Sequence, residues 1–285
     1  MQSMTNPPFT SHYPRLLTIA GSDSGGGAGI QADLKTFSAL GCFGMTAITA
    51  LTAQNTCGVR AIHGVPPQML TDQIDAVVED IGVDAVKIGM LHSPEIVQAV
   101  ANAIDRYLLP HVVLDPVMVA TSGAVLIDSP AIASLVRELF GRAVLVTPNL
   151  DEASLLVGRP LTNEADMQTA ALELLAKGAK AVLLKGGHLT GDVVSDLLQV
   201  AGAAPHWMRA PRIATANTHG TGCTLSSSIA AYLALGYTVV GAVEAARAYV
   251  RGALAAGANV KTGQGSGPLN HGFAPQMMRL KPLSS

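Results

Sequence analysis

The sequence predicts an α/β protein with a parallel central sheet. Short apolar runs bounded by turn residues alternate along the chain with longer runs that have helical spacing. The short runs are almost continuously apolar, as expected for parallel strands that are covered on both faces. The 285 residues fit one large α/β domain, because no linker, repeat or low-complexity segment divides them.

The individual elements follow from this alternation. We expect strands at Leu16–Ala20, Met45–Leu51, Ala85–Ile88, His111–Leu114, Ala143–Val146 and Ala181–Leu184. We expect helices at Ala28–Leu40, Pro67–Asp80, Pro94–Leu108, Pro130–Phe140, Glu164–Lys177, Leu225–Leu235 and Val239–Ala256. Several of these helices begin with proline, whose fixed φ suits a first turn. We expect residues 1–14 to be a disordered tail, 15–273 to form the single domain and 274–285 to form a C-terminal tail.

The composition of the chain argues against several classes of partner and site. Lys and Arg number 18 against 20 Asp and Glu, and no basic block is present, so nucleic acid is not an expected partner. The three cysteines lack the spacing of a zinc site or a disulfide framework, and a reducing cytoplasm is expected. No apolar run reaches the roughly 18 residues of a membrane span. The charged fraction of 13% is compatible with apolar surface buried in an oligomer, and equally with a high content of alanine.

Unusual polar loops follow several of the expected strands. They comprise residues 21–29, Gly89-Met90, 115–118, 147–152 and 185–188. Because the carboxyl ends of parallel strands converge at one edge of a sheet, these loops are expected to form one shared site. The glycines of residues 21–29 lack the G-x-G-x-x-G spacing of a dinucleotide site, and no segment has the Walker A order.

The segment Thr215–Thr224 leads directly into an expected helix. Its glycines allow close approach of the backbone to a ligand, and a helix N-terminus attracts anions. A thiolate is favoured at such a terminus, so Cys223 is a candidate base or nucleophile beside a phosphate. The alternative is an ordinary helix capped by Thr221 or Thr224 with a buried cysteine.

Seven ordered motifs resemble one enzyme family. They are residues 20–36, 53–56, 87–91, 114–118, 147–149, 185–188 and 217–224, and the similarity extends from about Leu16 to His271. They closely resemble the hydroxymethylpyrimidine/phosphomethylpyrimidine kinases. The resemblance implies a ribokinase-like three-layer α/β/α fold with a mostly parallel central sheet. It also implies ATP-dependent phosphorylation of 4-amino-5-hydroxymethyl-2-methylpyrimidine to its monophosphate and then its diphosphate in thiamine biosynthesis, with Mg²⁺, by a cytoplasmic homodimer.

The resemblance also implies where the pyrimidine binds. The substrate-binding positions are Gly21, Asp23, Ala28, Gln54, Met90 and Val117. Gln54 would read the aminopyrimidine edge, since a side-chain amide offers a donor beside an acceptor. Asp23 would bond a ring substituent, and the Met90 thioether would pack on the ring face. The alternatives are a Gln54 loop amide bonded to its own backbone and a Met90 that belongs to the core.

The resemblance implies that the remaining motifs bind the nucleotide, bind the metal ion and accept the substrate proton. Asp115 and Glu152 would organise Mg²⁺, which needs only one or two carboxylates besides phosphates. Nucleotide and phosphate contacts are assigned to Asn149, Lys185, Thr218 and Gly220, and the anion hole to Gly220, Thr221 and Gly222. Cys223 would take the proton of the substrate hydroxyl. A phosphate monoester, with a second pKa of about 6, needs no such base. His188 is expected to be a loop contact.

One departure and two alternatives stay open. Many relatives have Ala-Lys-Ser-Gly where this chain has Ala120-Thr121-Ser122-Gly123, so either the second phosphorylation is weaker or another residue replaces the lysine. Pyridoxal kinase is the first alternative, because pyridoxal is also a flat methylated ring with a hydroxymethyl group. Gln54 favours the aminopyrimidine. A non-catalytic pyrimidine-binding regulator is the second alternative, but it would be expected to lack Cys223, Lys185 or the acidic pair.

Overall fold

A mixed nine-stranded sheet forms the centre of the protein. A computed structural model describes residues 9–118, 127 and 129–283. The strand order is β10-β9-β8-β7-β6-β5-β2-β3-β4, and neighbours from β3 through β2, β5, β6 and β7 to β8 are parallel. The strands are β2 (Arg15–Asp23), β3 (Phe43–Asn55), β4 (Gly58–Gly64), β5 (Ala85–Ile88), β6 (Val112–Leu114), β7 (Leu145–Val146), β8 (Ala181–Leu184), β9 (Val193–Val200) and β10 (His206–Pro211).

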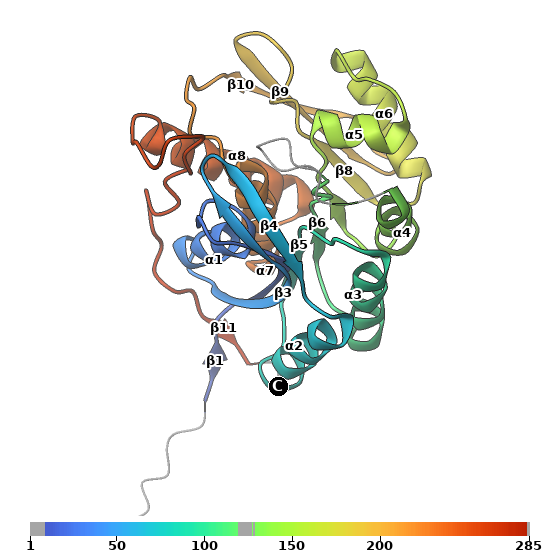
Figure 1. The fold of residues 1–285 in the computed structure, drawn as a ribbon, viewed down its shortest axis with the longest axis vertical. Coiled ribbons are helices and arrows are strands. Elements are labelled where there is room, and N and C mark those ends of the chain that lie inside the picture. Colours follow the sequence, from blue (N-terminus) through green and yellow to red (C-terminus); the bar gives the residue numbers. More distant parts are fainter. Residues whose placement is uncertain (1–8, 119–126, 128, 284–285) are drawn as a thin grey trace, which may run out of the picture.

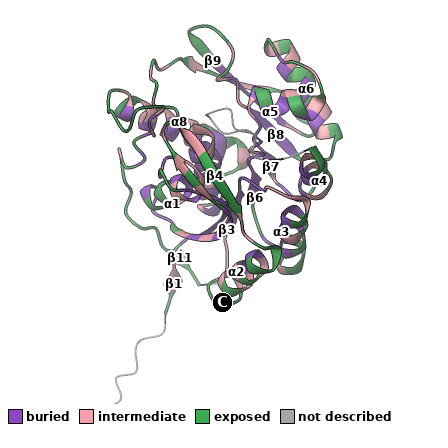
Figure 2. Cartoon of the chain, viewed as in Figure 1, coloured by how far each residue is buried: buried purple, intermediate pink, exposed green. Residues whose placement is uncertain are grey.

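Helices cover both faces of this sheet (Figure 1). They are α1 (Gly29–Ala39), α2 (Pro67–Asp80), α3 (Pro94–Tyr107), α4 (Ser129–Leu139), α5 (Leu150–Val157), α6 (Glu164–Ala176), α7 (Thr221–Ala234) and α8 (Val239–Gly257). Side-chain alternation divides the core: Leu17 and Ile19 pack in a cluster with residues of α2 to α6, whereas Leu16 packs with α1, α7 and α8. The buried layers lie on the two sides of the sheet (Figure 2). The predicted three-layer α/β/α fold is confirmed.

The strands of the nine-stranded sheet that were not predicted lie at its two margins. Strands β4, β9 and β10 were not predicted, and each pairs antiparallel with its neighbour. The middle of β4 is exposed, so it lacks the apolar run by which a buried strand is identified. The short helix α5 was also missed, and its residues were assigned to a loop and the chain after it. Its start carries a capping box made by Asn149 and Glu152.

The segments expected to be terminal tails contain a small sheet of their own. Ser11–His12 (β1) pairs antiparallel with Lys281–Pro282 (β11). Arg15, His12 and Lys281 all lie within 4 Å of the Asp84 carboxylate, so the sheet sits beside a cluster of ion pairs. The division of the chain at residues 15 and 273 stays a prediction.

The expected helix at Leu225 begins one turn earlier, at Thr221. Its N-cap is Gly220, which has a φ of 83° and contributes no side chain, so neither predicted threonine acts as a side-chain N-cap. The Thr221 hydroxyl donates instead to the Thr218 carbonyl, and Thr224 Oγ1 lies 2.8 Å from the Gly220 carbonyl oxygen. The early start places Cys223 in the first turn of α7.

Candidate active site

One cavity of about 610 Å³ opens at the carboxyl edge of the parallel strands. Every residue predicted for the site lines it: Gly21, Asp23, Ala28, Gln54, Met90, Asp115, Val117, Asn149, Glu152, Lys185, Thr218, Gly220, Thr221, Gly222 and Cys223. Loops that are far apart in the sequence therefore meet in one place, as the parallel topology requires. Their individual roles stay predictions.

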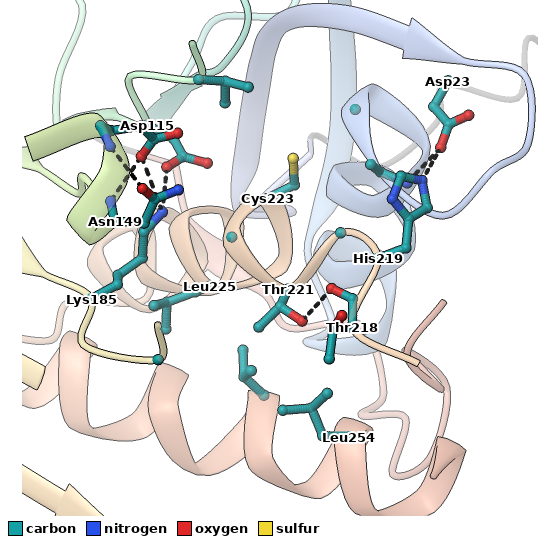
Figure 3. A pocket seen from close by; sticks show the side chains of 18 of the residues that line it. Asp23, Asp115, Asn149, Lys185, Thr218, His219, Thr221, Cys223, Leu225 and Leu254 are labelled. Carbon is teal, nitrogen blue, oxygen red and sulfur yellow. Dashed lines mark hydrogen bonds and ion pairs between the residues drawn. The ribbon is translucent and has the colours of Figure 1, made fainter. Parts of the chain in front are cut away.

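Cys223 occupies the middle of this cavity (Figure 3). On one side lies the cluster of Asp115 and Lys185, and on the other lies the pair of Asp23 and His219. The first backbone N–H groups of a helix have no acceptor within that helix, so the start of α7 presents donors to the cavity. An anion bound there would lie between the two side-chain groups.

The expectation that the helix terminus lowers the thiol pKa is wrong. Burial raises the pKa of Cys223 to about 11, and the carboxylates of Asp33 and Asp115 act in the same direction. The positive charge of Lys87 and the N–H of Gly29 oppose this rise without cancelling it. The thiol is therefore mostly protonated at neutral pH until its surroundings change.

Asp115, Glu152 and Lys185 form a charged cluster at one end of the cavity. Lys185 Nζ donates to Asp115 Oδ1 at 2.9 Å and lies 4.0 Å from Glu152 Oε2. Burial opposes ionisation of Asp115, but the charges of Lys185 and Lys87, together with the hydrogen bonds from Lys185 and Thr147, outweigh it and lower the pKa of this carboxyl. Burial, together with the charge of Asp115, raises the pKa of Glu152 to about 7. The two acids thus have different protonation behaviour at neutral pH.

Secondary structure holds this cluster in place. Asn149 Oδ1 accepts from the Glu152 N–H at 2.9 Å, and Glu152 Oε2 accepts from the Asn149 N–H at 2.8 Å. The side-chain hydroxyl of Thr147 donates to Asp115 Oδ1 at 3.1 Å. A Cβ placed on Gly222 would lie 3.2 Å from Lys185 Nζ, so a glycine keeps room for the ammonium group beside α7.

The acidic pair fits Mg²⁺ only in combination with phosphate. Within the described ranges, no group of three or more His, Cys, Asp or Glu side chains could hold a metal ion. Asp115 and Glu152 supply the one or two carboxylates through which Mg²⁺ is usually bound when phosphates complete its coordination. The donor set therefore suits a metal–nucleotide complex better than a free ion.

Asp23 shapes the glycine-rich loop. Its Oδ1 accepts from the Gly25 N–H at 2.8 Å, and its Oδ2 accepts from the N–H groups of Gly27 at 3.1 Å and Ala28 at 2.9 Å. Nε2 of His219 lies 2.8 Å from the same Oδ2. Burial alone would raise the Asp23 pKa, but the contacts with His219 and these N–H groups lower it. Both carboxylate oxygens are engaged within the protein, so Asp23 holds the loop in shape, and its bond to a ring substituent stays a prediction.

Gln54 and Met90 face the same end of the cavity as this loop. Gln54 Oε1 accepts from the Thr52 hydroxyl at 3.2 Å, and its Nε2 lies 3.5 Å from Nε2 of His219. The Gln54 side chain thus contacts other side chains, rather than its own backbone as the alternative supposed. A Cβ on Gly21 would lie 3.2 Å from Met90 Sδ, so the glycine lets this buried thioether reach the cavity.

The hairpin that carries Gln54 is fastened at its tip to the chain after α8. The Thr56 hydroxyl oxygen accepts from the N–H groups of Gln264 and Gly265, each at 3.2 Å. A Cβ on Gly265 would lie 2.1 Å from the Thr56 carbonyl oxygen. Farther along the same segment, the His219 N–H donates to the Gly267 carbonyl at 3.1 Å. One C-terminal loop therefore contacts both the hairpin and the loop before α7.

Glycine is also required where the two loops of the site meet. A Cβ on Gly220 would lie 1.9 Å from the carbonyl oxygen of Gly27. This contact brings the backbone before α7 directly against the glycine-rich loop.

Part of the cavity wall is apolar. Ile213, Leu225, Val250 and Leu254 line it. Arg247 Nε donates to Asp196 at 2.7 Å, so this cation at the wall already has a protein partner. At the rim, His188 Nδ1 lies 2.8 Å from an Asp151 carboxylate oxygen, and both side chains are exposed.

Sequence reasoning missed His219, Lys87 and Asp33 as site residues. His219 and Lys87 line the cavity, and Asp33 contacts Lys87 from behind it. A signal was present for Lys87, because it is a charged residue within an apolar run predicted to be a buried strand. Thr121, where relatives carry lysine, lies outside the described residues.

A family model described as phosphomethylpyrimidine kinase matches residues 23–270. The chain is 51% identical over 256 residues to the hydroxymethylpyrimidine/phosphomethylpyrimidine kinase of Rhizobium meliloti, covering 90% of this chain and 96% of that protein. It is 52% identical over 270 residues to the thiamine biosynthesis bifunctional protein ThiED of Geobacter sulfurreducens. That match covers 94% of this chain but only 54% of the bifunctional protein.

A solved structure is also similar. The pyridoxal kinase of Staphylococcus aureus in complex with AMP-PCP and pyridoxal superimposes with a TM-score of 0.85 at 32% identity, covering 95% of this chain and 100% of that one. In the part of the chain that the structure describes, none of the helices combines the length and hydrophobicity needed to cross a membrane.

Proposed function

The chain belongs to the phosphomethylpyrimidine kinase family, and from this premise we propose that it phosphorylates 4-amino-5-hydroxymethyl-2-methylpyrimidine and then its monophosphate for thiamine biosynthesis. It is a kinase with a ribokinase-like three-layer fold. The observation that carries the proposal is the position of Cys223 at the start of α7, between the end of the cavity that holds Asp23 and His219 and the end that holds Lys185. Gln54 contacts His219 at the first of these ends.

The cavity offers a place for each part of the two substrates. A flat ring fits between Gly21, Met90 and Gln54, whose amide can donate and accept at one ring edge. The phosphates of ATP fit between the start of α7 and Lys185, and its base fits against the apolar wall that includes Leu225 and Leu254. This order brings the hydroxymethyl group and the terminal phosphate together near Cys223.

Phosphoryl transfer requires charge neutralisation and alignment more than covalent chemistry by the protein. Lys185 and the N–H groups of the first turn of α7 would stabilise the charge on the equatorial oxygens. Asp115 and Glu152 would hold Mg²⁺ against the phosphates. When bound, this ion supplies further neutralisation of the transferred group.

Cys223 would serve the first reaction alone. The Cys223 thiol first loses its proton to solvent. The substrate oxygen then bonds to the terminal phosphorus as the bond to the leaving ADP breaks, and the hydroxyl proton passes to the Cys223 thiolate, which becomes a thiol again. Because the transition state is loose, that proton can leave late. In the second reaction the attacking group is a phosphate monoester, which is largely ionised near neutral pH and needs no base.

The decisive experiment compares three substrates with one enzyme preparation. ADP release is measured with ATP and Mg²⁺ in the presence of the hydroxymethylpyrimidine, its monophosphate or pyridoxal. We expect turnover with both pyrimidines and none without Mg²⁺. Thermal stabilisation by the pyrimidine without turnover would instead identify a binding protein and overturn the proposal.

Pyridoxal kinase is the second candidate, supported by the similarity to the Staphylococcus aureus enzyme. Gln54→Leu separates the two, because it removes both hydrogen-bonding groups from the ring edge while keeping the size of the side chain. Loss of aminopyrimidine turnover with retention of any pyridoxal turnover would support Gln54 as the residue that selects the amino group.

A homodimer in a reducing compartment completes the proposal. Exposed Leu51, Ile62 and Met69 on β3, β4 and α2 offer apolar surface for a second copy, and Cys42, Cys57 and Cys223 are free thiols, as in the cytoplasm. Sedimentation velocity of the wild type and of Ile62→Lys tests the dimer. A monomeric wild type would contradict it.

A further inference from the structure

A fully buried ion pair lies behind the cavity. Lys87 on β5 and Asp33 on α1 are both 0% exposed, and Lys87 Nζ donates to Asp33 Oδ2 at 2.9 Å. The hydroxyl of Thr18 on β2 donates to the same oxygen at 2.6 Å, and the hydroxyl of Ser227 on α7 donates to Asp33 Oδ1. The Asp33 carboxylate thus joins four elements of the fold.

This network is attached to α7 directly beneath Cys223. Ser227 follows Cys223 by one helical turn, so the two side chains lie on the same face of α7. Lys87 also lines the cavity that Cys223 enters. A Cβ on Gly89 would lie 2.8 Å from Lys87 Nζ, so the glycine after β5 leaves space for this ammonium group.

Four charged groups interact electrostatically with the Cys223 sulfur. Lys87 is the largest of the charge effects on its pKa and lowers it, whereas Asp33 and Asp115 raise it. Lys185 is the fourth, since the Cys223 charge in turn raises the lysine pKa. Three donors stabilise the Asp33 carboxylate, and the lowering of the Cys223 pKa by Lys87 exceeds the rise caused by Asp33.

A buried ion pair is a weak source of stability, because desolvation offsets the attraction between its charges. Its placement behind the proposed base suggests another use. We propose that Lys87 is a positioning residue, held by Asp33, whose charge stabilises the Cys223 thiolate that must form before this sulfur can accept the proton of the substrate hydroxyl. The inference rests on the proposed role of Cys223, but it is tested below on the protein without substrates.

The test measures alkylation of Cys223 by iodoacetamide at pH 8, followed by the mass of its peptide, in a Cys57→Ser background. Cys42 is buried, and burial raises its pKa to about 12, so it does not compete. Asp33→Asn removes the negative charge and should increase the rate at least about threefold. The double variant Lys87→Met with Asp33→Asn removes both charges and should decrease it at least about threefold, since a tenfold change corresponds to one pKa unit.

Thr18→Val is the matched control, because it removes a hydroxyl from the same carboxylate without changing the charge; it should stay within about twofold of the wild type. The double variant is used because Lys87→Met alone would leave a buried carboxylate without its cation. Circular dichroism verifies folding of each variant. A rate change in the same direction for both charge variants, or none beyond that of Thr18→Val, would overturn the inference. A wild type without pyrimidine kinase activity would overturn the proposed function instead.

Discussion

Asp23 and His219 are 196 residues apart in the sequence, yet His219 Nε2 lies 2.8 Å from Asp23 Oδ2 inside the protein. Asp23 organises the glycine-rich loop at the end of the cavity where we propose that the pyrimidine binds, and His219 directly precedes the N-cap of α7. The contact therefore connects the loop proposed to hold the ring with the helix start proposed to hold the phosphates. Such a tie suits a reaction that depends on alignment.

We expect His219→Asn to raise the KM for the hydroxymethylpyrimidine roughly tenfold, because hydrogen bonds to charged groups contribute about 1.5–3 kcal/mol. The KM for ATP should change less, since the apolar wall and Lys185 are untouched. Steady-state kinetics with each substrate varied in turn measures both constants. His206→Gln, a partly exposed site outside the cavity, is the control. Equal increases in the two KM values would contradict this prediction.

The second prediction compares alanine substitutions at two glycines, one at each end of α7. Both have positive φ, 83° at Gly220 and 91° at Gly236. A Cβ at Gly220 would lie 1.9 Å from a backbone oxygen, whereas nothing lies within 4 Å of one at Gly236. Gly220→Ala should therefore reduce kinase activity by two orders of magnitude or prevent folding. Gly236→Ala should cost only the roughly 1–2 kcal/mol of a left-handed alanine.

Thermal unfolding and ADP release of the two variants make this comparison. The backbone strain is nearly matched, so any difference reports the contact with Gly27. Similar activity in the two variants would mean that the loops can separate without loss of function.

Cys223→Ser should slow phosphorylation of the alcohol about 10²-fold or more, the usual contribution of general base catalysis. Phosphorylation of the monophosphate should slow much less, because its attacking oxygen is already ionised. Single-substrate rates with each pyrimidine measure the two effects separately. Cys57→Ser, at the exposed hairpin tip, is the control. Losses of equal size in the two reactions would exclude a selective base.

The lowered pKa of the buried His271 leads to a prediction of how the stability of the protein depends on pH. Burial lowers its pKa to about 4, and its Nε2 lies 2.9 Å from Thr224 Oγ1 in the first turns of α7. Between its ordinary pKa of about 6.5 and this value, the unfolded chain binds a proton that the native protein does not. This contribution to stability is therefore complete above about pH 6.5 and is lost as the pH falls, at up to about 1.4 kcal/mol per pH unit.

Urea unfolding at pH 7.5 and pH 5.0 tests the sign and size of this effect. In His271→Asn the loss of stability between the two pH values should be smaller than in the wild type by roughly 1–2 kcal/mol. His206→Gln should keep the wild-type difference. An unchanged difference in His271→Asn would show that His271 is not the group responsible.

The sequence predicted the buried middle of the fold best. Ala85–Ile88 and Ala181–Leu184 coincide with β5 and β8, because a short apolar run between turn residues is typical of a strand that is covered on both faces. The margins could not be predicted in this way, since β4 is largely exposed and owes its conformation to pairing with β3. The capping box of Asn149 and Glu152 was a visible signal for α5.

The residues of the candidate site also fall into a group that could be predicted and a group that could not. Motif loops after parallel strands predicted which residues would gather, and all of them line one cavity. Partners across the chain were not predictable, because no spacing links Lys87 to Asp33 or His219 to Asp23. The predicted direction of the Cys223 pKa shift was wrong for the same reason. The sequence indicates the position of the thiol on α7, whereas its burial and its neighbouring carboxylates depend on tertiary structure.

The fastening of Thr56 to Gln264 and Gly265 bears on how the protein is made. Gln54 is synthesised early, but the segment that holds its hairpin and the loop before α7 leaves the ribosome more than two hundred residues later. The strands of the sheet can pair during translation, whereas the end of the cavity proposed to bind the ring cannot be completed until that late segment emerges. A nascent chain arrested before residue 264 should therefore contain most of the sheet and yet fail to bind a pyrimidine.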